Sequence, residues 1–267
     1  MLVGGKFRFP VVQFSEAIFS ALVDYYPLYT NLSLSARAQG SIISNYSYRV
    51  TDRFVASSEW VKSKIHAESS KPVDVAPIGP GIDCGIQGFT SSPMKKTGHF
   101  SILLVAREWD RKDGDRAVAV ARAMHERDKS VRLTVIGKQL PQENWLRSFS
   151  RVDRDDLAEL YREHDVVFEF TKANTGGVVI ADSFSASTPV IATYTGAVPS
   201  LIENGVNGML IGVNESVNDV VSRVECLKDI SVAEHFRKKA FEKYETSYNW
   251  DVWASSVVEV LESAASK

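Results

Sequence analysis

The residues best suited to chemistry lie in one stretch, 171–193. Gly176 and Gly177 have no side chain, so a ligand can approach the backbone closely there. A short helix is predicted to begin at about Gly177, and the free N–H groups of its first turn favour a phosphate. Asp182, just inside that helix, could accept hydrogen bonds from sugar hydroxyls, and a buried strand is expected from Val190 to Thr193. The stretch therefore predicts a site for a nucleotide diphosphate joined to a sugar.

Two cations add to this interpretation. Arg107 and Lys112 follow a predicted apolar strand, 100–106, and so fall where a parallel strand would end. They could neutralise a diphosphate and stabilise the charge that grows on the leaving phosphate as a glycosidic bond breaks. Lys138 follows another predicted strand and could meet the base or the ribose.

Each of these signals also has an ordinary structural explanation. Paired glycines before a helix occur in α/β proteins of many functions, so the loop alone leaves both interpretations open. The segment after residue 106 could equally be a solvated turn, because four further residues in it are charged. These residues are Glu108, Asp110, Arg111 and Asp113.

The loop, helix and strand of 171–193 resemble the centre of the retaining GT-B glycosyltransferases of the large family four. In that family a Glu-x7-Glu element runs through a Gly-rich loop into a helix and then into a small-Thr-Pro-Val-Ile strand. In this chain the two acid positions hold Asn174 and Asp182. The spacing fits, the second acid is conservatively changed, and the first is neutral.

Two further motifs of that family follow the same order along the chain. The turn after residue 106 resembles its Arg-x4-Lys-Gly element through Arg107 and Lys112, with Asp113 standing before the glycine. Segment 195–208 is similar to an element that usually reads Gly-Gly-x-Pro-Glu, and Ser200 stands where that Glu would be. The motifs make the resemblance specific for the fold.

The resemblance covers about residues 51–263 and implies an α/β fold. This fold is the Rossmann-like doubly wound parallel sheet of a GT-B C-terminal domain, with a reduced or incomplete N-terminal domain. Strands that alternate with helices over 99–211 indicate the same kind of sheet. The expected domain limits are 1–86 for the N-terminal, acceptor-side region, 87–98 for a linker, 99–248 for the donor-binding domain, and 249–267 for a C-terminal helix that returns to the N-terminal region.

Periodicity predicts the individual elements. Apolar residues at helical spacing predict a helix from Phe14 to Tyr25, ended by Pro27. We interpret it as a packed helix, because a membrane-surface helix would carry lysines and arginines where this one has acids and serines. The other expected helices are 35–50, 59–65, 115–127 and 154–164, and the other expected strands are 53–58, 73–78, 100–106, 131–136, 165–170 and 208–211.

Composition limits the possible partners. The 267 residues carry a net charge of −2, which gives no basic surplus for nucleic acid. The two cysteines, Cys84 and Cys226, lie far apart, so we expect free thiols and no metal site. No apolar run is long enough to span a membrane, and no leader peptide is expected. We therefore expect a cytoplasmic protein that can lie peripherally at the membrane.

The resemblance also implies a role for each matched residue. Arg107 and Lys112 would hold the donor diphosphate, Asn174 would lie near the sugar, and Asp182 would bind the ribose. No metal is required if the cations stabilise the leaving phosphate. The expected site residues are Arg107, Lys112 and Asn174 for catalysis, and Gly176, Gly177, Asp182, Lys138 and Thr175 for donor binding.

Two functions fit these expectations. One is a hexosyltransferase that moves a sugar, with retention, from a nucleotide-diphosphate-sugar such as a UDP or GDP sugar to a glycan, lipid or protein acceptor. The donor is then a substrate, and no prosthetic group is expected. The other is a non-catalytic or partner-dependent nucleotide-sugar-binding subunit, favoured by Asn174, Ser200 and the short N-terminal region. In that case a second chain or another copy of this chain would supply the acceptor domain. A GT-B epimerase fits less well, because the first-domain acids and histidine that it would use have no visible place.

Overall fold

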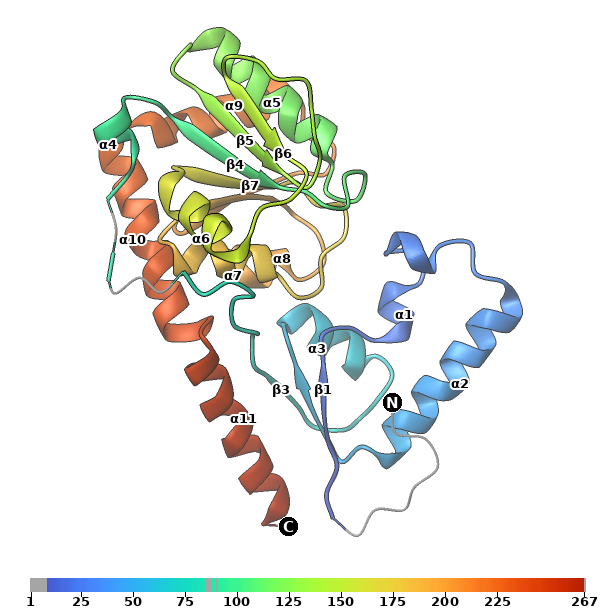
Figure 1. Ribbon diagram of the computed structural model, residues 1–267. Helices are drawn as coiled ribbons and strands as arrows, with labels where there is room; N and C mark the ends of the chain where they lie inside the picture. The colour runs from blue at the N-terminus through green and yellow to red at the C-terminus, as the bar shows by residue number, and fades with distance from the viewer. Residues whose placement is uncertain (1–8, 85–87, 90, 267) are drawn as a thin grey trace. The chain divides into compact units, whose positions relative to one another are not determined.

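The computed structural model describes residues 9–84, 88–89 and 91–266, and the chain forms two compact units (Figure 1). The first comprises the described residues up to Ile78 and those from Trp250 onward. The second runs from Gly79 to Asn249. None of the helices in the described ranges combines the length and apolar character needed to cross a bilayer.

The first unit is built on a small parallel sheet in the order β1-β2-β3. Phe54 and Ala56 of the middle strand face one apolar core, and Val55 between them faces another, which Val260 of the last helix completes. Both faces of the sheet are therefore covered, as parallel strands require. Its elements are β1 (Val12–Ser15), α1 (Phe19–Leu22), η1 (Pro27–Tyr29), α2 (Leu34–Val50), β2 (Arg53–Ala56), α3 (Glu59–His66), β3 (Val73–Val75) and α11 (Trp250–Ala265).

The predicted helix from Phe14 to Tyr25 is wrong over its first part. Residues Val12 to Ser15 instead form β1, which pairs in parallel with β2, and only Phe19–Leu22 is α-helical. The pairing satisfies the backbone groups of this segment through a strand some 40 residues further on, and a local pattern cannot show that partner. By contrast, α3 begins at residue 59 as predicted, and the Ser58 side chain caps it by accepting a hydrogen bond from Val61 N.

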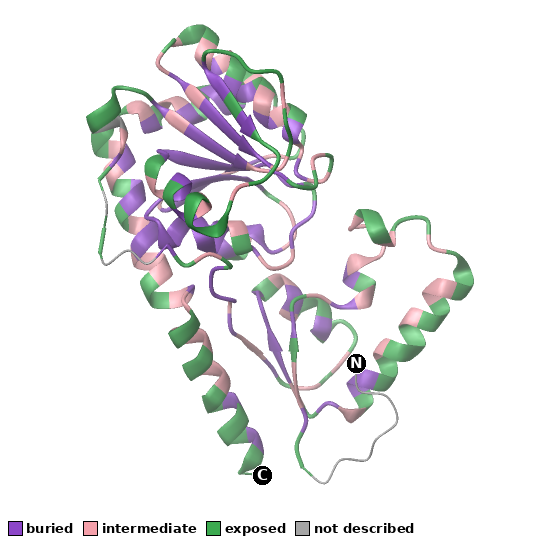
Figure 2. Cartoon of the chain, viewed as in Figure 1, coloured by how far each residue is buried: buried purple, intermediate pink, exposed green. Residues whose placement is uncertain are grey.

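The second unit is a six-stranded parallel sheet in the order β6-β5-β4-β7-β8-β9 (Figure 1). Its strands are buried along most of their length (Figure 2), because α5 and α9 pack on one face and α6, α7 and α10 on the other. The strands are β4 (Ser101–Val105), β5 (Arg132–Ile136), β6 (Leu146–Phe149), β7 (Val166–Glu169), β8 (Val190–Thr193) and β9 (Gly208–Ile211). The helices are α4 (Met94–Thr97), α5 (Gly114–Arg127), α6 (Arg154–Glu163), α7 (Val178–Ser185), α8 (Val198–Leu201), α9 (Val217–Val224), η2 (Glu225–Lys228) and α10 (Ile230–Ser247).

This strand order confirms the predicted doubly wound fold. The chain winds outward from β4 through β5 to β6, then returns to the other side of β4 and winds outward again from β7. The order therefore reverses between β4 and β7, and in such sheets ligands bind beyond the carboxyl ends of the strands at that point.

The expected domain limits stay a prediction, and the division into units does not follow them at residues 79–84 or at Asn249. Residues 79–84 group with the second unit, and of the expected linker 87–98, residues 87 and 90 lie outside the described ranges. The backbone amides of Ile82 and Cys84 donate to Asp182 and Ser185 on α7, which attaches this segment to the second unit.

A buried arginine stabilises the second unit at the amino end of β7. Arg237 of α10 is fully buried, and its guanidinium donates to the carbonyl oxygen of His164 at 2.9 Å. Burial lowers the pKa of Arg237 to about 10, while the negative charge of Asp165 acts in the opposite direction. Asp165 in turn accepts hydrogen bonds from Ser92 and from the backbone of Ser101. These contacts attach α10 to the sheet.

Replacing this arginine should destabilise the fold strongly. Arg237→Met leaves the buried Asp165 without its nearby positive charge, so we expect a loss of roughly 3 kcal/mol or more in the free energy of unfolding. Urea unfolding followed by tryptophan fluorescence measures the loss. The neighbouring Lys238→Met is the control, because its side chain is 65% exposed and should change stability little. Equal effects of the two substitutions would contradict the prediction.

Candidate functional site

The predicted site residues converge on the point where the strand order reverses. Arg107 and Lys112 follow β4, and Asn174 to Gly177 follow β7, the adjacent strand. Their loops therefore leave the sheet side by side at its carboxyl edge. This is where a doubly wound sheet forms its ligand crevice.

A line of polar contacts joins the two loops. The ammonium of Lys112 lies 2.5 Å from Oε1 of Glu169, the last residue of β7. The same oxygen accepts from Nδ2 of Asn174 at 3.2 Å, and Oδ1 of Asn174 accepts from the backbone N–H of Gly177 at 2.8 Å. Glu169 is fully buried, and Lys112 and Asn174 nearly so. The structure thus brings three predicted residues together around an acid that was not predicted.

A second set of contacts, from side chains and backbone, holds the same two loops together. The guanidinium of Arg111 donates to the hydroxyl of Thr171 and to the carbonyl oxygen of Ala173, while the carbonyl oxygen of Arg111 accepts from Lys172 N at 2.7 Å. Lys172 also forms an ion pair with Asp113 at 3.1 Å. The segment from 171 to 174 is therefore fixed against the loop after β4.

Asp113 explains how the loop accommodates its departure from the family pattern. Its backbone lies in the left-handed region, with φ of 47°, directly before α5. Glycine adopts this conformation most easily, and aspartate is among the few other residues that tolerate it. Gly114 follows and packs so tightly on the Trp109 ring that a Cβ there would lie 2.4 Å from it. Asp113 thus adopts the left-handed conformation, and Gly114 makes the close contact with the Trp109 ring.

Gly177 is required by both its conformation and its surroundings. Its φ is +71°, and a Cβ at this position would lie 2.1 Å from Cδ1 of Leu201. It precedes α7, which begins at Val178 as predicted. Thr175 and Gly176, the other expected donor-binding residues of this loop, lie between Asn174 and Gly177 and are half-buried.

The other two predicted cations lie at neighbouring strand ends. Arg107 is exposed directly after β4, and Lys138 is exposed after β5. The backbones of Arg107 and Gly137 pack closely, because a Cβ on Gly137 would lie 2.6 Å from Arg107 N. The Lys138 ammonium lies 4.3 Å from the centre of the Trp109 ring, a cation–π distance. Arg107 and Lys138 therefore lie along the same carboxyl edge of the sheet as Lys112 and Asn174.

Asp182 lies further along α7 and is almost completely buried. Its Oδ1 accepts a hydrogen bond from the backbone N–H of Ile82 at 2.8 Å. Burial raises the pKa of Asp182 to about 7, although hydrogen bonds from the backbones of Ile82 and Gly81 lower it in part. This carboxyl group therefore fixes the segment that enters the unit, and its proposed contact with a ribose stays a prediction.

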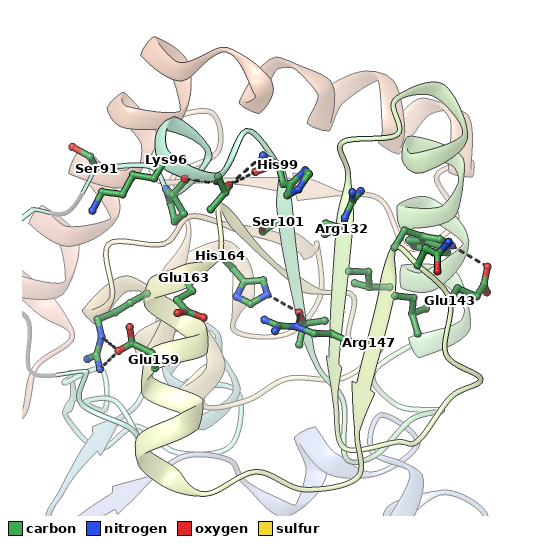
Figure 3. Close-up of a pocket in the computed structure, with 18 residues that line it drawn as sticks. Ser91, Lys96, His99, Ser101, Arg132, Glu143, Arg147, Glu159, Glu163 and His164 are labelled. Carbon is green, nitrogen blue, oxygen red and sulfur yellow. Dashed lines mark hydrogen bonds and ion pairs between the residues drawn. The ribbon is translucent and has the colours of Figure 1, made fainter.

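A large cavity lies elsewhere in the unit and has a different character. It measures about 960 Å³ and is lined by residues at the amino ends of the strands, among them Ser101, Arg132 and Arg147 (Figure 3). The charged and polar groups in it contact one another. Arg162 is paired with Glu159, and both ring nitrogens of the buried His164 have partners. We place the candidate site at the opposite edge of the sheet, where the loops after β4 and β7 meet.

Two residues of the site were not predicted from the sequence. Arg111 was counted among the charges of a solvated turn, and its contacts reach residues some 60 positions away. Glu169 carried a usable signal, because it is the one charged residue in a strand that is otherwise Val, Val and Phe. An acid that is buried in a parallel strand requires a partner.

Comparison with known proteins assigns this region to a family. The family model described as Glycosyl transferases group 1 matches residues 99–229, which include β4, β7 and α7 with their loops. Residues 99–229 form a glycosyl transferases group 1 domain. The expected family resemblance is confirmed, and so is the α/β fold.

Individual relatives of the glycosyl transferases group 1 domain match at low identity. N-acetyl-alpha-D-glucosaminyl L-malate synthase of Bacillus anthracis is 28% identical over 108 residues, which are 36% of this chain and 28% of that protein. The fold is similar to that of sucrose-phosphate synthase from Thermosynechococcus elongatus, with a TM-score of 0.73 and 15% identity over 97% of this chain and 68% of that one. It is also similar to Anabaena HepE solved with UDP, with a TM-score of 0.74 and 18% identity over 95% of this chain and 72% of that one. The chain thus matches less than a third of the length of this curated relative.

Gly177 should not tolerate a side chain. Gly177→Ala combines a strained φ with a clash against Leu201, so we expect a loss of roughly 3 kcal/mol in the free energy of unfolding. Gly205→Ala is the control, because Gly205 also has a positive φ, of +81°, but no atom within 4 Å of its Cβ position. That control should lose only about 1 kcal/mol. Combining Gly177→Ala with Leu201→Ala should cost less than the sum of the two single losses measured by urea unfolding, and strictly additive losses would contradict the clash.

Asp182 should make the stability of the domain depend on pH. Its folded pKa of about 7 lies above the ordinary value of an unfolded aspartate, so the folded state holds a proton that the unfolded state has released between about pH 4 and pH 7. The contribution of Asp182 to stability is therefore present at low pH and is lost as pH rises through 7. Asp182→Asn keeps an acceptor for Ile82 N and removes the titration.

Urea unfolding at pH 5 and pH 8 measures this effect. From pH 5 to pH 8, the free energy of unfolding of Asp182→Asn should rise by roughly 2–3 kcal/mol relative to that of the wild type. Asp156→Asn, at an exposed position on α6, should follow the wild type at both. An Asn variant that parallels the wild type would show that Asp182 is ionised throughout.

Proposed function

We propose that this chain is a glycosyltransferase that binds a nucleotide-diphosphate-sugar at the carboxyl ends of β4 and β7 and transfers its sugar, with retention, to an acceptor. The observation that carries the proposal is the cluster of Lys112, Glu169, Asn174 and Gly177 at the reversal point of a glycosyl transferases group 1 domain. The similar fold of Anabaena HepE, solved with UDP and glucose, supports a nucleotide and a sugar as ligands.

The arrangement suits the chemistry of a departing diphosphate. Arg107 is exposed at the crevice, and the Lys112 ammonium has two further N–H donors beyond the one directed at Glu169. We assign both to the phosphates, where fixed positive groups stabilise the charge that develops as the glycosidic bond breaks. The backbone of Thr175 and Gly176 would approach the diphosphate, and the side chain of Asn174 would lie near the sugar.

The remaining donor contacts belong to the nucleoside. Lys138 lies at the next strand end and would reach the base or ribose, and Asp182 would bind the ribose hydroxyls. The donor is a substrate in this proposal, and the cations do the work that a metal does in other transferases. A hexose is the sugar that we assign, with a glycan, lipid or protein as acceptor.

One observation favours a second candidate function. The charge of Lys112 is already opposed by a buried carboxylate, and Asn174 is neutral where the resembled family has an acid. A site of this kind could bind a nucleotide sugar while another chain, or another copy of this one, supplies what the transfer requires. Binding without turnover would distinguish this function from the first.

Nucleotide binding is the direct test of the proposal. We expect the purified chain to bind one of UDP, GDP and ADP in a calorimetric titration, and the same sample to hydrolyse or transfer the corresponding sugar nucleotide. Arg107→Ala and Lys112→Ala should each weaken binding by about tenfold or more, because each removes a charge-assisted hydrogen bond to phosphate. Arg127→Ala is the control, since Arg127 is exposed at the last residue of α5, a full helix length from the loop after β4. Unchanged affinity in both site variants, or no binding by the wild type, would contradict the assignment.

A further inference from the structure

Glu169 is an acid in a position that disfavours acids. It ends β7, where the three preceding residues are apolar and buried, and its own side chain is fully buried. A buried carboxylate is stable only when it is paired and hydrogen-bonded. Here Lys112 provides the pair at 2.5 Å, and the Asn174 amide provides a second hydrogen bond at 3.2 Å.

The identity of residue 174 fits this acid. The Asn174 amide donates through Nδ2 to Glu169 and accepts through Oδ1 from Gly177 N, so it uses both ends. An ionised Asp or Glu at this position accepts hydrogen bonds but donates none. It would also place a second negative charge against Glu169. The amide at 174 and the acid at 169 therefore complement each other.

We propose that Glu169 is a positioning residue of the donor site, which supplies from the end of β7 the carboxylate that the resembled family carries at the position of Asn174. This inference rests on the proposed function. Glu169 holds the Lys112 ammonium beside the loop that receives the diphosphate, and through Asn174 it fixes the turn at Gly177. A rigid strand end holds such a group more accurately than a loop does.

The geometry gives Glu169 an indirect role. Its second oxygen, Oε2, is buried and has no hydrogen-bond partner among the described residues, and the side chain has no exposed surface. The carboxylate therefore acts on the donor through Lys112 and Asn174. A residue that acts in this way should be replaceable by an acid at the partner position, provided that the amide moves in exchange.

Exchanging the two groups tests the proposal. The variants are Glu169→Gln, Asn174→Glu and the combination of both, with Glu126→Gln on the exposed face of α5 as the control. The affinity for the nucleotide that the wild type binds most tightly among UDP, GDP and ADP is measured by calorimetry, and the unfolding equilibrium constant by urea titration. Each single change should weaken binding at least tenfold, and the combination should return to within about threefold of the wild type.

A pH profile separates positioning from general damage to the structure. Asn174→Glu alone places two carboxylates around one lysine, so its nucleotide affinity should fall between pH 5 and pH 8 as the shared proton is lost. The exchanged variant should show no such fall relative to the wild type, whose own profile already contains the titration of Asp182. If Glu169→Gln does not fold, Glu169→Asp keeps the charge while it withdraws the carboxylate from Lys112. That variant should fold and bind about tenfold more weakly.

Three results would overturn the inference. The first is an exchanged variant whose loss equals the product of the two single losses, and the second is unchanged affinity in Glu169→Asp. The third is tighter binding by Glu169→Gln, which would show that Glu169 only competes with phosphate for Lys112. If the wild type binds none of the three nucleotides, the proposed function fails separately. The exchange then still tests whether residues 169 and 174 depend on each other. If they do, the effect of the double variant on the unfolding equilibrium constant should differ by tenfold or more from the product of the two single effects.

Discussion

The buried ion pair of Lys112 and Glu169 is the constraint on which the candidate site depends. Both side chains are almost fully withdrawn from water, so each charge is tolerated only because the other is close. One partner follows β4 and the other ends β7, and these strands are neighbours only because the sheet reverses its order between them. Separating the loops would leave two unpaired buried charges. The pair therefore holds the two loops together at the point where the strand order reverses.

The contacts around the pair act in the same direction. Arg111 and Lys172 join the two loops through backbone and side-chain groups, and Asn174 carries the connection on to Gly177 at the start of α7. Gly177 in turn has space only for a hydrogen atom beside Leu201 of α8. The backbone that would approach a diphosphate is thus held from both sides. A preorganised arrangement of this kind is what electrostatic stabilisation of a leaving group requires.

The sheet was predictable from the sequence because its central strands are short apolar runs between turn residues. β8 and β9 begin and end as expected, whereas β6 was missed because it is an edge strand whose alternate residues, Arg147 and Phe149, are exposed. The site was predictable as far as local motifs extend, which includes Gly177 before α7. The Lys112 and Glu169 pair joins residues 57 positions apart, and only the three-dimensional fold shows that they meet.

The two acid positions of the resembled element have different surroundings in this chain. Asn174 is neutral and donates a hydrogen bond to Glu169, and Asp182 accepts one from the backbone of Ile82, with a pKa that burial raises to about 7. Glu169 opposes the charge of Lys112, and Asp113 opposes that of the exposed Lys172, so the net positive charge available to a diphosphate would come mainly from the exposed Arg107 and Lys138. Lys112 then contributes directed hydrogen bonds, and the exposed pair contributes long-range attraction. The donor site proposed here would thus depend on Arg107 for attraction of the diphosphate and on Lys112 for its orientation.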